Sequence, residues 1–565
     1  MTDAPSLTLF NSLTRQLEPF QPVHEGEARV YTCGPTVYNY PHIGNMRAYV
    51  FADILGRTLS HKGYKLTHVI NITDVGHLTD DADAGEDKME KMARQQHQSI
   101  WDIAKHYTEA YWADIAALNI REPAKWSIAT DYVPQMIEFA KSIADKHCYE
   151  LDSGLYFDVS SVADYGRLAR EDDLMSELMK ISSGLRSLQS EDDHEVLKSK
   201  FHKLAVDFLT TLREFYRRKS LKKYQDLIDI WTWADSPADD QTPLRILESV
   251  AATGARLREG RIESVEGKRN EEDFAIWRKT PPGEKRQMEW DSPWGKGAPG
   301  WHLECSVMSG DLLGFPFDIH TGGIDHREIH HPNEIAQNQA FCCTNGLDVP
   351  ANSGARVWMH NNFLVERSGK MSKSSGEFLR LQLLIDKGYH PLAYRMMCLQ
   401  AHYRSELEFS WEGLGAALTR LKRMIMAAER LKDVAPGEAR HPKLAAMLDA
   451  FEKAIGEDLN TPVALTALED VLAAKKVDPA AKRAAVEAMD SVLGLDLFDI
   501  QRAGLRLKPK GVEITEAEIE DVLARRKQAR ADKDFATSDA LRDELAAKGV
   551  EVMDGDPLGW EWKLG

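Results

Sequence analysis

Four side chains of the kind that binds zinc stand out in the sequence. Cys33 and Cys305 supply thiols, while His330 and Glu334 lie four residues apart in HHPNEIAQ, so a helix would place both on one face. Two thiols, an imidazole and a carboxylate form a reasonable zinc set. The spacing alone favours the alternative that the cysteines are simply buried, because Cys33 and Cys305 are far apart in the chain. His331 competes with His330 for the role of ligand.

A candidate phosphate site is PHIGN (41–45), which lies between an expected strand and an expected helix. The free N–H groups and positive dipole end of a helix N-terminus suit phosphate. His42 can donate to a phosphate oxygen, and Gly44 lets a nucleotide approach the backbone. The local pattern by itself favours a simpler interpretation, in which His42 caps the helix and Gly44 makes a turn.

The segment GKMSKSSG (369–376) places Lys370 and Lys373 among small residues. Such a loop can neutralise the charge on a transferring phosphoryl group. Taken alone it is better interpreted as a solvated surface loop. An α/β sheet, however, brings a late loop back to the mouth of its first helix. The two segments together therefore indicate a nucleotide site.

Two further features could bind adenosine or a small substrate. Gly322 and Asp325 lie in GGID after an expected strand, where glycine permits close approach and a carboxylate can accept from ribose hydroxyls. The alternative is a common turn. Trp301, beside His302, either lines a small pocket or packs in the core. Three other cysteines are expected in the core: Cys342, Cys343 and Cys398.

The elements that must position these residues are of α/β type. The pattern predicts a strand that runs into a loop at Gly34 and Pro35 within 28–38, then a helix over 46–63 and a strand over 65–75. Together they form a βαβ unit with parallel strands. Residues 86–147 are predicted to be helical. A second α/β stretch begins near 271, with a helix over 334–344 and strands at 273–277, 317–323 and 357–364.

The rest of the chain is predicted to be mainly helical. Apolar residues at helical spacing predict an insertion over 171–260, whose default role is surface decoration. After about 405 strand signals stop, and amphipathic, Ala-rich helices of bundle type follow. A last helix over 514–549 is rich in Arg and Lys. Trp560 and Trp562 either stack on unpaired nucleic-acid bases or close a small aromatic core.

Composition excludes several classes of protein. The 565 residues carry a net charge of −18, with 43% hydrophobic and 28% charged residues, an ordinary globular balance. No apolar run is long enough to span a membrane, and the first residues lack a secretory pattern. Six cysteines are too few for a disulfide scaffold, so a reduced cytoplasm is expected. The acidic balance argues against non-specific coating of nucleic acid.

Taken together, the motifs resemble those of cysteinyl-tRNA synthetases, a family of class I aminoacyl-tRNA synthetases, along almost the whole chain. HIGN is similar to the family's HIGH motif except at Asn45, and GKMSKS matches its KMSKS loop. Other familiar segments are YTCGPTVY, NITD, KRNEEDFAIW, SPWGKGAPGWHLECS, FDIHTGGID, HHPNEIAQ, GEDLNTP and SDALRDEL. So many motifs in the family's order make the resemblance highly specific.

The resemblance implies a two-step reaction. Cysteine and ATP, with Mg²⁺ present, would form cysteinyl adenylate, and the cysteinyl group would pass to the terminal adenosine of tRNA(Cys). One zinc ion per chain would bind the substrate thiolate far better than a serine hydroxyl, which makes an editing domain unnecessary. A cytoplasmic monomer with no membrane partner is expected.

Roles for individual residues also follow from the resemblance. The zinc ligands would be Cys33, Cys305, His330 and Glu334, and the substrate cysteine would contact Cys33, Thr73 and Trp301. The catalytic residues would be His42, Asn45, Lys370 and Lys373. ATP would contact Gly34, Thr36, His42, Gly44, Gly322, Asp325 and Lys373.

The implied fold is a Rossmann-type parallel-sheet catalytic domain with helical insertions, followed by a DALR-type helical bundle and a small C-terminal region. Five domains are expected. The first catalytic half with a helical connective segment covers 1–170, the insertion 171–260, and the second catalytic half with the zinc site and lysine loop 261–405. The tRNA-binding helical bundle covers 406–500 and the anticodon-binding region 501–565.

Three departures from the family pattern keep alternatives open. Asn45 replaces a histidine and cannot carry its charge, residues 75–88 differ from the commonest form, and the insertion has no recognised counterpart. One alternative is a cysteine ligase of the mycothiol-synthesis type that acts on an amino sugar, but that family lacks the C-terminal region. The other alternative is a non-catalytic paralogue that binds tRNA or cysteine.

Overall fold

The structure is a computed structural model, and most of the chain can be described. The described residues are 7–75, 93, 99–169, 265–342, 346–366, 369–370, 379–439, 441–556 and 558–565. The predicted insertion at 171–260 and the lysine-loop residues 371–378, including Lys373, lie outside them. So do Cys343 and almost all of residues 76–98.

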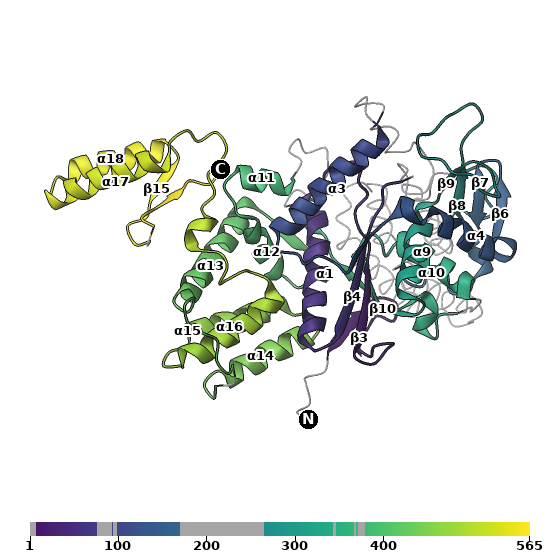
Figure 1. Cartoon of the computed structure of the whole chain (residues 1–565), viewed down its shortest axis with the longest axis horizontal. Helices are drawn as coiled ribbons and strands as arrows, with labels where there is room; N and C mark the ends of the chain where they lie inside the picture. The colour runs from purple at the N-terminus through teal and green to yellow at the C-terminus, as the bar shows by residue number, and fades with distance from the viewer. Residues whose placement is uncertain are drawn as a thin grey trace, which may run out of the picture.

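A five-stranded parallel sheet forms the centre of the molecule (Figure 1). Its strand order is β11-β10-β3-β4-β5, and every neighbouring pair is parallel. The inner strands are apolar and buried, as expected where helices cover both faces. The strands are β3 (Glu27–Thr32), β4 (Lys65–Ile72), β5 (Lys125–Ile128), β10 (Phe317–Gly323) and β11 (Ala355–Asn361).

Helices from different parts of the sequence pack on the two faces of this sheet (Figure 1). α1 (Ile43–His61) lies on one side, and α9 (Trp301–Leu313) and α10 (His330–Cys342) lie on the other. The predicted βαβ unit is confirmed, and its first strand ends at Thr32, just before the loop expected at Gly34 and Pro35. The chain leaves the sheet there because residues 33–42 form a loop before α1.

The order in which strands are added to the sheet changes side at β3. From β3 it continues to β4 on one side, and it returns much later to β10 on the other side. The loops that follow β3 and β10 therefore diverge at the carboxyl edge, which in open α/β sheets is where ligands bind.

The prediction of continuous helix over 86–147 is wrong in its described part. Strand β5 separates α3 (Ile100–Ala117) from α4 (Val133–His147), with the 3-10 helix η1 (Ala129–Tyr132) before α4. Only four residues long, β5 is held by its pairing with β4 at the sheet edge. Such a short edge strand has no sequence periodicity of its own.

The predicted strand at 273–277 is present, but it does not belong to the parallel sheet. It forms β8 (Phe274–Lys279) of a separate antiparallel sheet with order β6-β7-β8-β9. Its partners are β6 (Cys148–Leu151), β7 (Gly154–Phe157) and β9 (Gly297–Pro299). The pairing of β7 with β8 joins segments that lie on either side of the insertion in the sequence.

A helical region packs against α1 and continues the main hydrophobic core. The helices after residue 405 confirm the helical region predicted there from amphipathic spacing, whereas α11 and α12 precede it. α14 to α16 lie on the same side of the sheet as α1 (Figure 1). The helices are α11 (Leu381–Asp386), α12 (Pro391–Leu399), α13 (Trp411–Glu429), α14 (Ala445–Gly456), α15 (Thr461–Ala473) and α16 (Pro479–Leu493).

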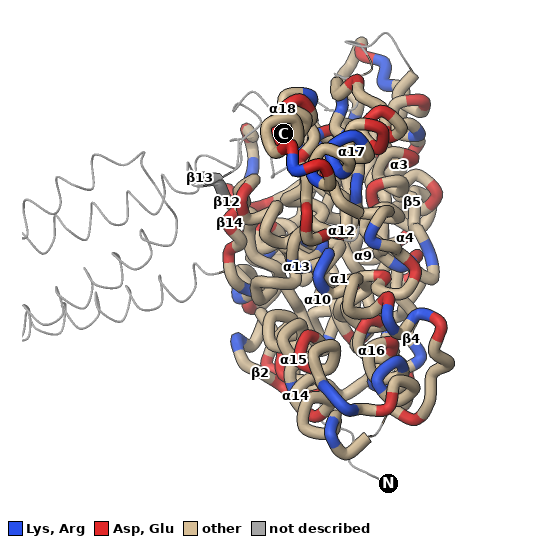
Figure 2. The backbone as a smooth tube through the Cα atoms, turned by 90° about the vertical axis from the view of Figure 1, so that its left-hand side faces the viewer, with Lys and Arg blue, Asp and Glu red and all other residues tan. Residues whose placement is uncertain are grey.

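The predicted single helix over 514–549 is two helices. α17 (Glu516–Ala531) ends before Lys533, whose φ is 61°, and Asp534 caps α18 (Phe535–Ala547). The helices pack side by side at the far end of the molecule from α9 and α10 (Figure 1). α17 carries both acidic and basic residues (Figure 2), the acidic ones in its first half and the basic ones in its second half. Arg526 and Arg530 both pair with Asp554.

The expectation that strands stop near 405 is also wrong. β14 (Leu407–Phe409) forms a three-stranded sheet with β12 (Leu364–Glu366) and β13 (Gly369–Lys370). Near the C-terminus, β15 (Val550–Val552) pairs with β16 (Trp560–Trp562). The remaining elements are β1 (Thr8–Asn11), β2 (Gln16–Pro19), and the 3-10 helices η2 (Val159–Ser161), η4 (Pro350–Ser353) and η5 (Arg502–Leu505).

Trp560 and Trp562 belong to the core of the C-terminal unit. Their exposed fractions are 0% and 2%, and their rings meet edge to face at 4.8 Å. They pack with Ile519, Leu541 and other apolar residues of α17 and α18. The small-core interpretation is therefore correct, and neither indole is available to stack on a base.

Candidate active site

A polar pocket lies at the carboxyl edge of the parallel sheet, where β3 and β10 diverge. Most of the residues singled out in the sequence line it, although they come from four separate parts of the chain. These residues are Cys33, Gly34, Thr36, His42, Gly44, Asn45, Thr73, Trp301, Cys305, Asp325 and His330.

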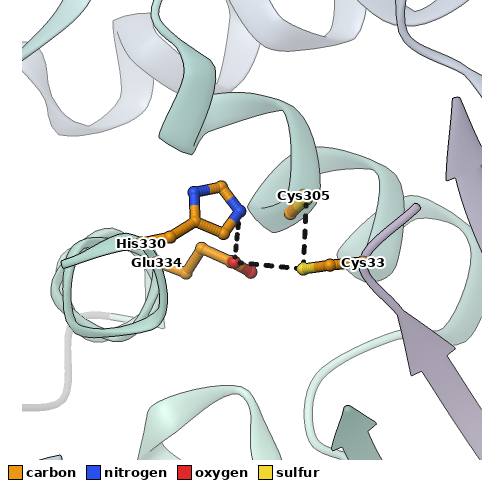
Figure 3. Close-up of side chains that lie close together, drawn as sticks. All are labelled: Cys33, Cys305, His330 and Glu334. Atoms are coloured by element: carbon orange, nitrogen blue, oxygen red, sulfur yellow. Dashed lines mark hydrogen bonds and ion pairs between the residues drawn. The ribbon is translucent and has the colours of Figure 1, made fainter. Parts of the chain in front are cut away.

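The four candidate zinc ligands converge (Figure 3), and three of them, Cys33, Cys305 and His330, line this pocket. Cys33 follows β3, Cys305 lies on α9, and His330 and Glu334 share one face of α10. The two sulfur atoms are 3.9 Å apart. Oε1 of Glu334 lies 3.9 Å from Sγ of Cys33 and 3.0 Å from Nε2 of His330. All four donor atoms lie within 4.8 Å of one another, which suits a single ion.

A second layer of side chains orients these ligands. Nε2 of His320 lies 2.9 Å from Oε2 of Glu334, the oxygen that faces away from His330. Nδ1 of His330 lies 2.9 Å from Nδ1 of His302, and the Trp301 ring stacks on His330 at 4.1 Å between centroids. Partners of this kind hold metal ligands in position.

His331, the competitor of His330, also approaches the cluster. Its Nε2 lies 3.3 Å from Sγ of Cys33, and together with His320 and Glu334 these residues form an overlapping candidate set. Nδ1 of His331 contacts Nε2 of His360 at 2.7 Å. Cys33, Cys305 and His330 line the pocket, whereas His320 and His331 are not among the residues that line it. The set containing Cys305 and His330 is thus the one that a ligand in the pocket can reach.

The charges at this cluster fit a cation. Burial raises the pKa of the Cys33 thiol, and the Cys305 thiol pKa is raised as well, although its hydrogen bond with Cys33 opposes the shift. Burial lowers the pKa of His330 to about 3, which keeps its imidazole neutral. Burial alone would raise the pKa of Glu334, but His320 and His330 lower it to about 2. A divalent ion that binds here would release the protons of the two thiols. Its positive charge would then balance the negative charges of the two thiolates and the carboxylate.

His42 and Asn45 form a reciprocal cap at the start of α1. The backbone N–H of Asn45 donates to Nδ1 of His42 at 3.3 Å, and that of His42 donates to Oδ1 of Asn45 at 3.2 Å. The capping interpretation is thus correct, yet both residues also line the pocket. Gly44 is required here because a Cβ would lie 2.8 Å from the His42 ring.

Two other glycines allow close contacts within the protein. A Cβ on Gly34 would lie 1.5 Å from the carbonyl oxygen of Asn71, so no other residue fits where the loop after β3 passes β4. A Cβ on Gly322 would lie 2.7 Å from the His331 ring. Gly322 is absent from the described pocket lining, in which Gly323 and Asp325 take part.

Known proteins resemble this chain over its whole length. Residues 19–205 and 247–419 match the family described as tRNA synthetases class I (C) catalytic domain, and residues 515–557 match the cysteinyl-tRNA ligase anticodon binding domain. The cysteine–tRNA ligase of Novosphingobium aromaticivorans is 69% identical over 99% of this chain and 98% of its own length. That of Zymomonas mobilis is 45% identical over the same shares. The chain belongs to the cysteinyl-tRNA synthetase family.

The implied Rossmann-type architecture with a helical C-terminal region is therefore that of a class I aminoacyl-tRNA synthetase. Among solved structures, methionyl-tRNA synthetase of Mycobacterium tuberculosis aligns with 83% of this chain and 90% of its own, at 13% identity and a TM-score of 0.45. The match at 515–557 counts against the amino-sugar ligase, which lacks this region. The catalytic match leaves out residues 206–246, inside the predicted insertion.

In this cysteinyl-tRNA synthetase a hydrogen-bonded chain supports the pocket wall. Oγ1 of Thr73 donates to Oε2 of Glu304 at 2.8 Å and accepts from Nδ2 of Asn71 at 3.1 Å. Oδ1 of Asn71 in turn accepts from the N–H of Gly34 at 2.7 Å. The sequence interpretation missed Asn71 and Glu304 as site residues, although both lie in the quoted motifs NITD and GWHLECS.

The base of the synthetase's lysine loop borders the pocket. β13, which ends at Lys370, pairs with β12, and Leu364 of β12 lines the pocket. Cys398 is buried as expected, but Cys342 is exposed at the end of α10. No helix in the described part of the chain is both long and apolar enough to cross a bilayer.

The C-terminal unit of this family member exposes an aromatic side chain that the sequence interpretation overlooked. Phe535, the first residue of α18, is 63% exposed. It falls within the matched anticodon binding domain. The sequence could have indicated Phe535, because it is an aromatic residue directly after the helix cap Asp534 and does not fall on the apolar face of α18.

Proposed function

We propose that this cysteine–tRNA ligase forms cysteinyl adenylate in the pocket at the carboxyl edge of its parallel sheet. One observation carries the proposal: the cluster of Cys33, Cys305, His330 and Glu334 opens into the same cavity as the N-terminus of α1. A site for a thiol and a site for phosphate thus face each other across one cavity.

Zinc would be held by Cys33, Cys305, His330 and Glu334. When bound there, Zn²⁺ supplies a Lewis acid that prefers a thiolate to a hydroxyl, which separates cysteine from serine. Trp301 and Thr73, which line the same pocket, would bound the space for the rest of the amino acid. Trp301 also limits the movement of His330 through their stacked rings.

The chain's own groups would bind and orient ATP. The phosphates would lie at the start of α1, where His42 donates and the helix dipole favours negative charge. The glycine at 44 leaves the backbone accessible, and Asn45 holds His42 in place. Asp325, at the end of β10, would accept from ribose hydroxyls, and Thr36 and Gly34 would line the adenylate side.

In the first step the cysteine carboxylate attacks the α-phosphorus and pyrophosphate leaves, with Mg²⁺ arriving on ATP. His42, Lys370, Lys373 and the helix N–H groups stabilise the charge that develops on phosphorus, so positioning and electrostatics suffice without a protein nucleophile. In the second step a ribose hydroxyl of the terminal adenosine of tRNA(Cys) takes the cysteinyl group and releases AMP. Phe535 would stack on an unpaired base far from this pocket.

The test is ATP–pyrophosphate exchange with cysteine and with serine, on zinc-loaded and on chelated protein. We expect exchange that requires cysteine and zinc and that serine does not support. An acceptor assay with tRNA(Cys) and with an amino sugar then separates the ligase from its alternative. A folded, zinc-loaded protein without exchange would overturn the proposal and favour the non-catalytic paralogue.

Replacement of Lys373 by alanine tests the lysine loop directly. We expect K373A to reduce exchange by about 10²-fold or more, since one preorganised cation on the transferring group is lost. The unfolding midpoint should not change. Exchange at the unmodified rate would remove this lysine from the mechanism.

A further inference from the structure

Arg47 is a buried cation close to the pocket that the proposed reaction does not use. It lies on α1, two residues after Asn45, and is 2% exposed. Nη1 donates to the carbonyl oxygens of Asn362 and Phe363 at 2.8 and 2.6 Å. Nη2 donates to those of His402 and Ser405 at 3.2 and 2.6 Å. One guanidinium thus joins two segments that are separated by some forty residues of chain.

The four carbonyl oxygens belong to the entries of two strands. Residues 362–363 lead into β12, and residues 402–405 lead into β14. These strands pair in parallel, and β12 also pairs with β13, in which Val365 faces Lys370. The position of the three-stranded sheet relative to α1 is therefore set largely at Arg47.

The first turn of α1 also contacts the far side of the lysine loop. The N–H of Ile43 donates to the carbonyl oxygen of Leu379, three residues after the GKMSKSSG segment, at 2.8 Å. The carbonyl oxygen of Ile43 accepts from the Tyr394 hydroxyl at 2.5 Å. Within the first part of α1, Arg47 thus contacts the chain before the lysine motif and Ile43 contacts the chain after it.

Burial of this arginine is energetically costly. Removal from water lowers the pKa of Arg47, and its four acceptors are neutral carbonyl oxygens, not a carboxylate. A methionine would fill a similar volume without that cost. Only the planar fork of arginine, with five donors at fixed angles, can reach carbonyl oxygens of two segments together. The arrangement is that of a geometric clamp.

We propose that Arg47 is a positioning residue for adenylate formation. By clamping the entries of β12 and β14 to α1, it keeps the strand that leads into the lysine motif at a set distance from the phosphate end of α1. The inference rests on the proposed function of the pocket. It predicts a defect in the chemical step with ATP, and none in zinc or cysteine binding.

The test compares Arg47→Met and Arg47→Lys with Arg57→Met. Arg57 is a matched control because it lies on the same helix, is buried, and donates to the carbonyl oxygens of Ser491 and Asn119 as well as to Asp53, away from the lysine loop. The readouts are kcat and the two KM values for exchange, bound zinc, and the unfolding midpoint. All rates are measured well below the lowest midpoint.

We expect R47M to lower kcat for exchange by about 10²-fold, the size of effect that a misplacement of about 1 Å can cause. KM for cysteine and zinc content should not change. R47K keeps the charge but cannot reach both segments, so it should show most of the same loss. R57M should lower the midpoint by a similar amount and leave kcat within about twofold.

Two results would overturn the inference: equal loss of kcat in R47M and R57M, or a wild-type kcat in R47K. If R47M does not fold, the comparison of R47K with R57M decides. Absence of exchange in the wild-type enzyme would instead overturn the proposed function, so the two failures are distinguishable.

Discussion

Nε2 of His320 lies 2.9 Å from Oε2 of Glu334, while Nε2 of His330 lies 3.0 Å from Oε1 of the same carboxylate. One histidine thus holds the glutamate from β10, and the other completes the ligand set with it on α10. Since both imidazoles are buried, the carboxylate has little freedom to turn. The ligand geometry therefore depends on a residue that does not reach the pocket.

This relationship predicts that His320 tunes metal affinity. His320→Ala should weaken zinc binding by about 10–100-fold, the usual effect of removing such a support. Competition with a chelator of known affinity measures the change. His390→Ala, which removes a half-buried histidine that caps α12 and belongs to neither candidate ligand set, serves as the control and should not alter affinity. Equal zinc binding in H320A and the wild type would show that the support is dispensable.

Asn45 should matter through its side-chain oxygen. Asn45→Ala removes the acceptor for the His42 N–H, so it should destabilise the protein by about 0.5–2 kcal/mol and raise KM for ATP. Asn45→Asp keeps the acceptor and adds a charge that favours the helix N-terminus but repels phosphate. It should therefore preserve the unfolding midpoint and still lower exchange. Normal exchange in N45D would place ATP phosphates elsewhere.

Phe535 should act only on the tRNA-dependent step. Loss of one stacked base costs about 1–3 kcal/mol, so Phe535→Ala should lower kcat/KM for tRNA charging by about 10-fold and leave exchange unchanged. Val463→Ala is the matched control, because Val463 on α15 is an apolar side chain with 46% exposure. A parallel loss of both activities in F535A would indicate a structural role for the ring.

An ion pair between α1 and α14 predicts a pH-dependent contribution to stability. Burial would raise the pKa of Glu452, but hydrogen bonds from His61 and Lys62 lower it to about 2. Because the folded pKa lies below the unfolded value near 4.3, the stabilisation is complete above that value and is lost as pH falls towards 2. Glu452→Gln should lower the free energy of unfolding by about 1–2 kcal/mol at pH 7, since water screens the pair in part.

Urea denaturation of E452Q and the wild type at pH 7, 5 and 4 measures this contribution. The difference between their midpoints should be the same at pH 7 and 5 and should narrow by pH 4. A difference that stays constant down to pH 4 would mean that the carboxylate charge contributes nothing.

Local pattern was sufficient for several features of this protein. Apolar spacing predicted α1, α10 and the helices from α13 to α15, and the βαβ order predicted parallel strands. His330 and Glu334 lie four residues apart, so an α-helix places both on one face, since that separation is close to one helical turn. Whole motifs, such as HIGN followed much later by GKMSKS, sufficed for the family, since their order is rarely met by chance.

Local sequence pattern was insufficient wherever a contact between distant parts of the chain determines the secondary structure or the sheet to which a strand belongs. β5 exists only because it pairs with β4, and β8 belongs to its own sheet because β7 is its neighbour. The break at Lys533 turns one expected helix into two.

The metal cluster depends most strongly on tertiary structure. Cys33 and Cys305 are separated by most of the catalytic region, so no local spacing relates them, and burial of a cysteine alone is uninformative. They meet because β3 and α9 pack at the edge where the chain reverses across the sheet. The roles of Arg47, Trp560 and Trp562 likewise depend on tertiary contacts. The carbonyl oxygens that the Arg47 guanidinium binds and the apolar residues that bury the two indoles are brought together only by folding, because hydrogen-bond geometry and exclusion of water are properties of the packed molecule.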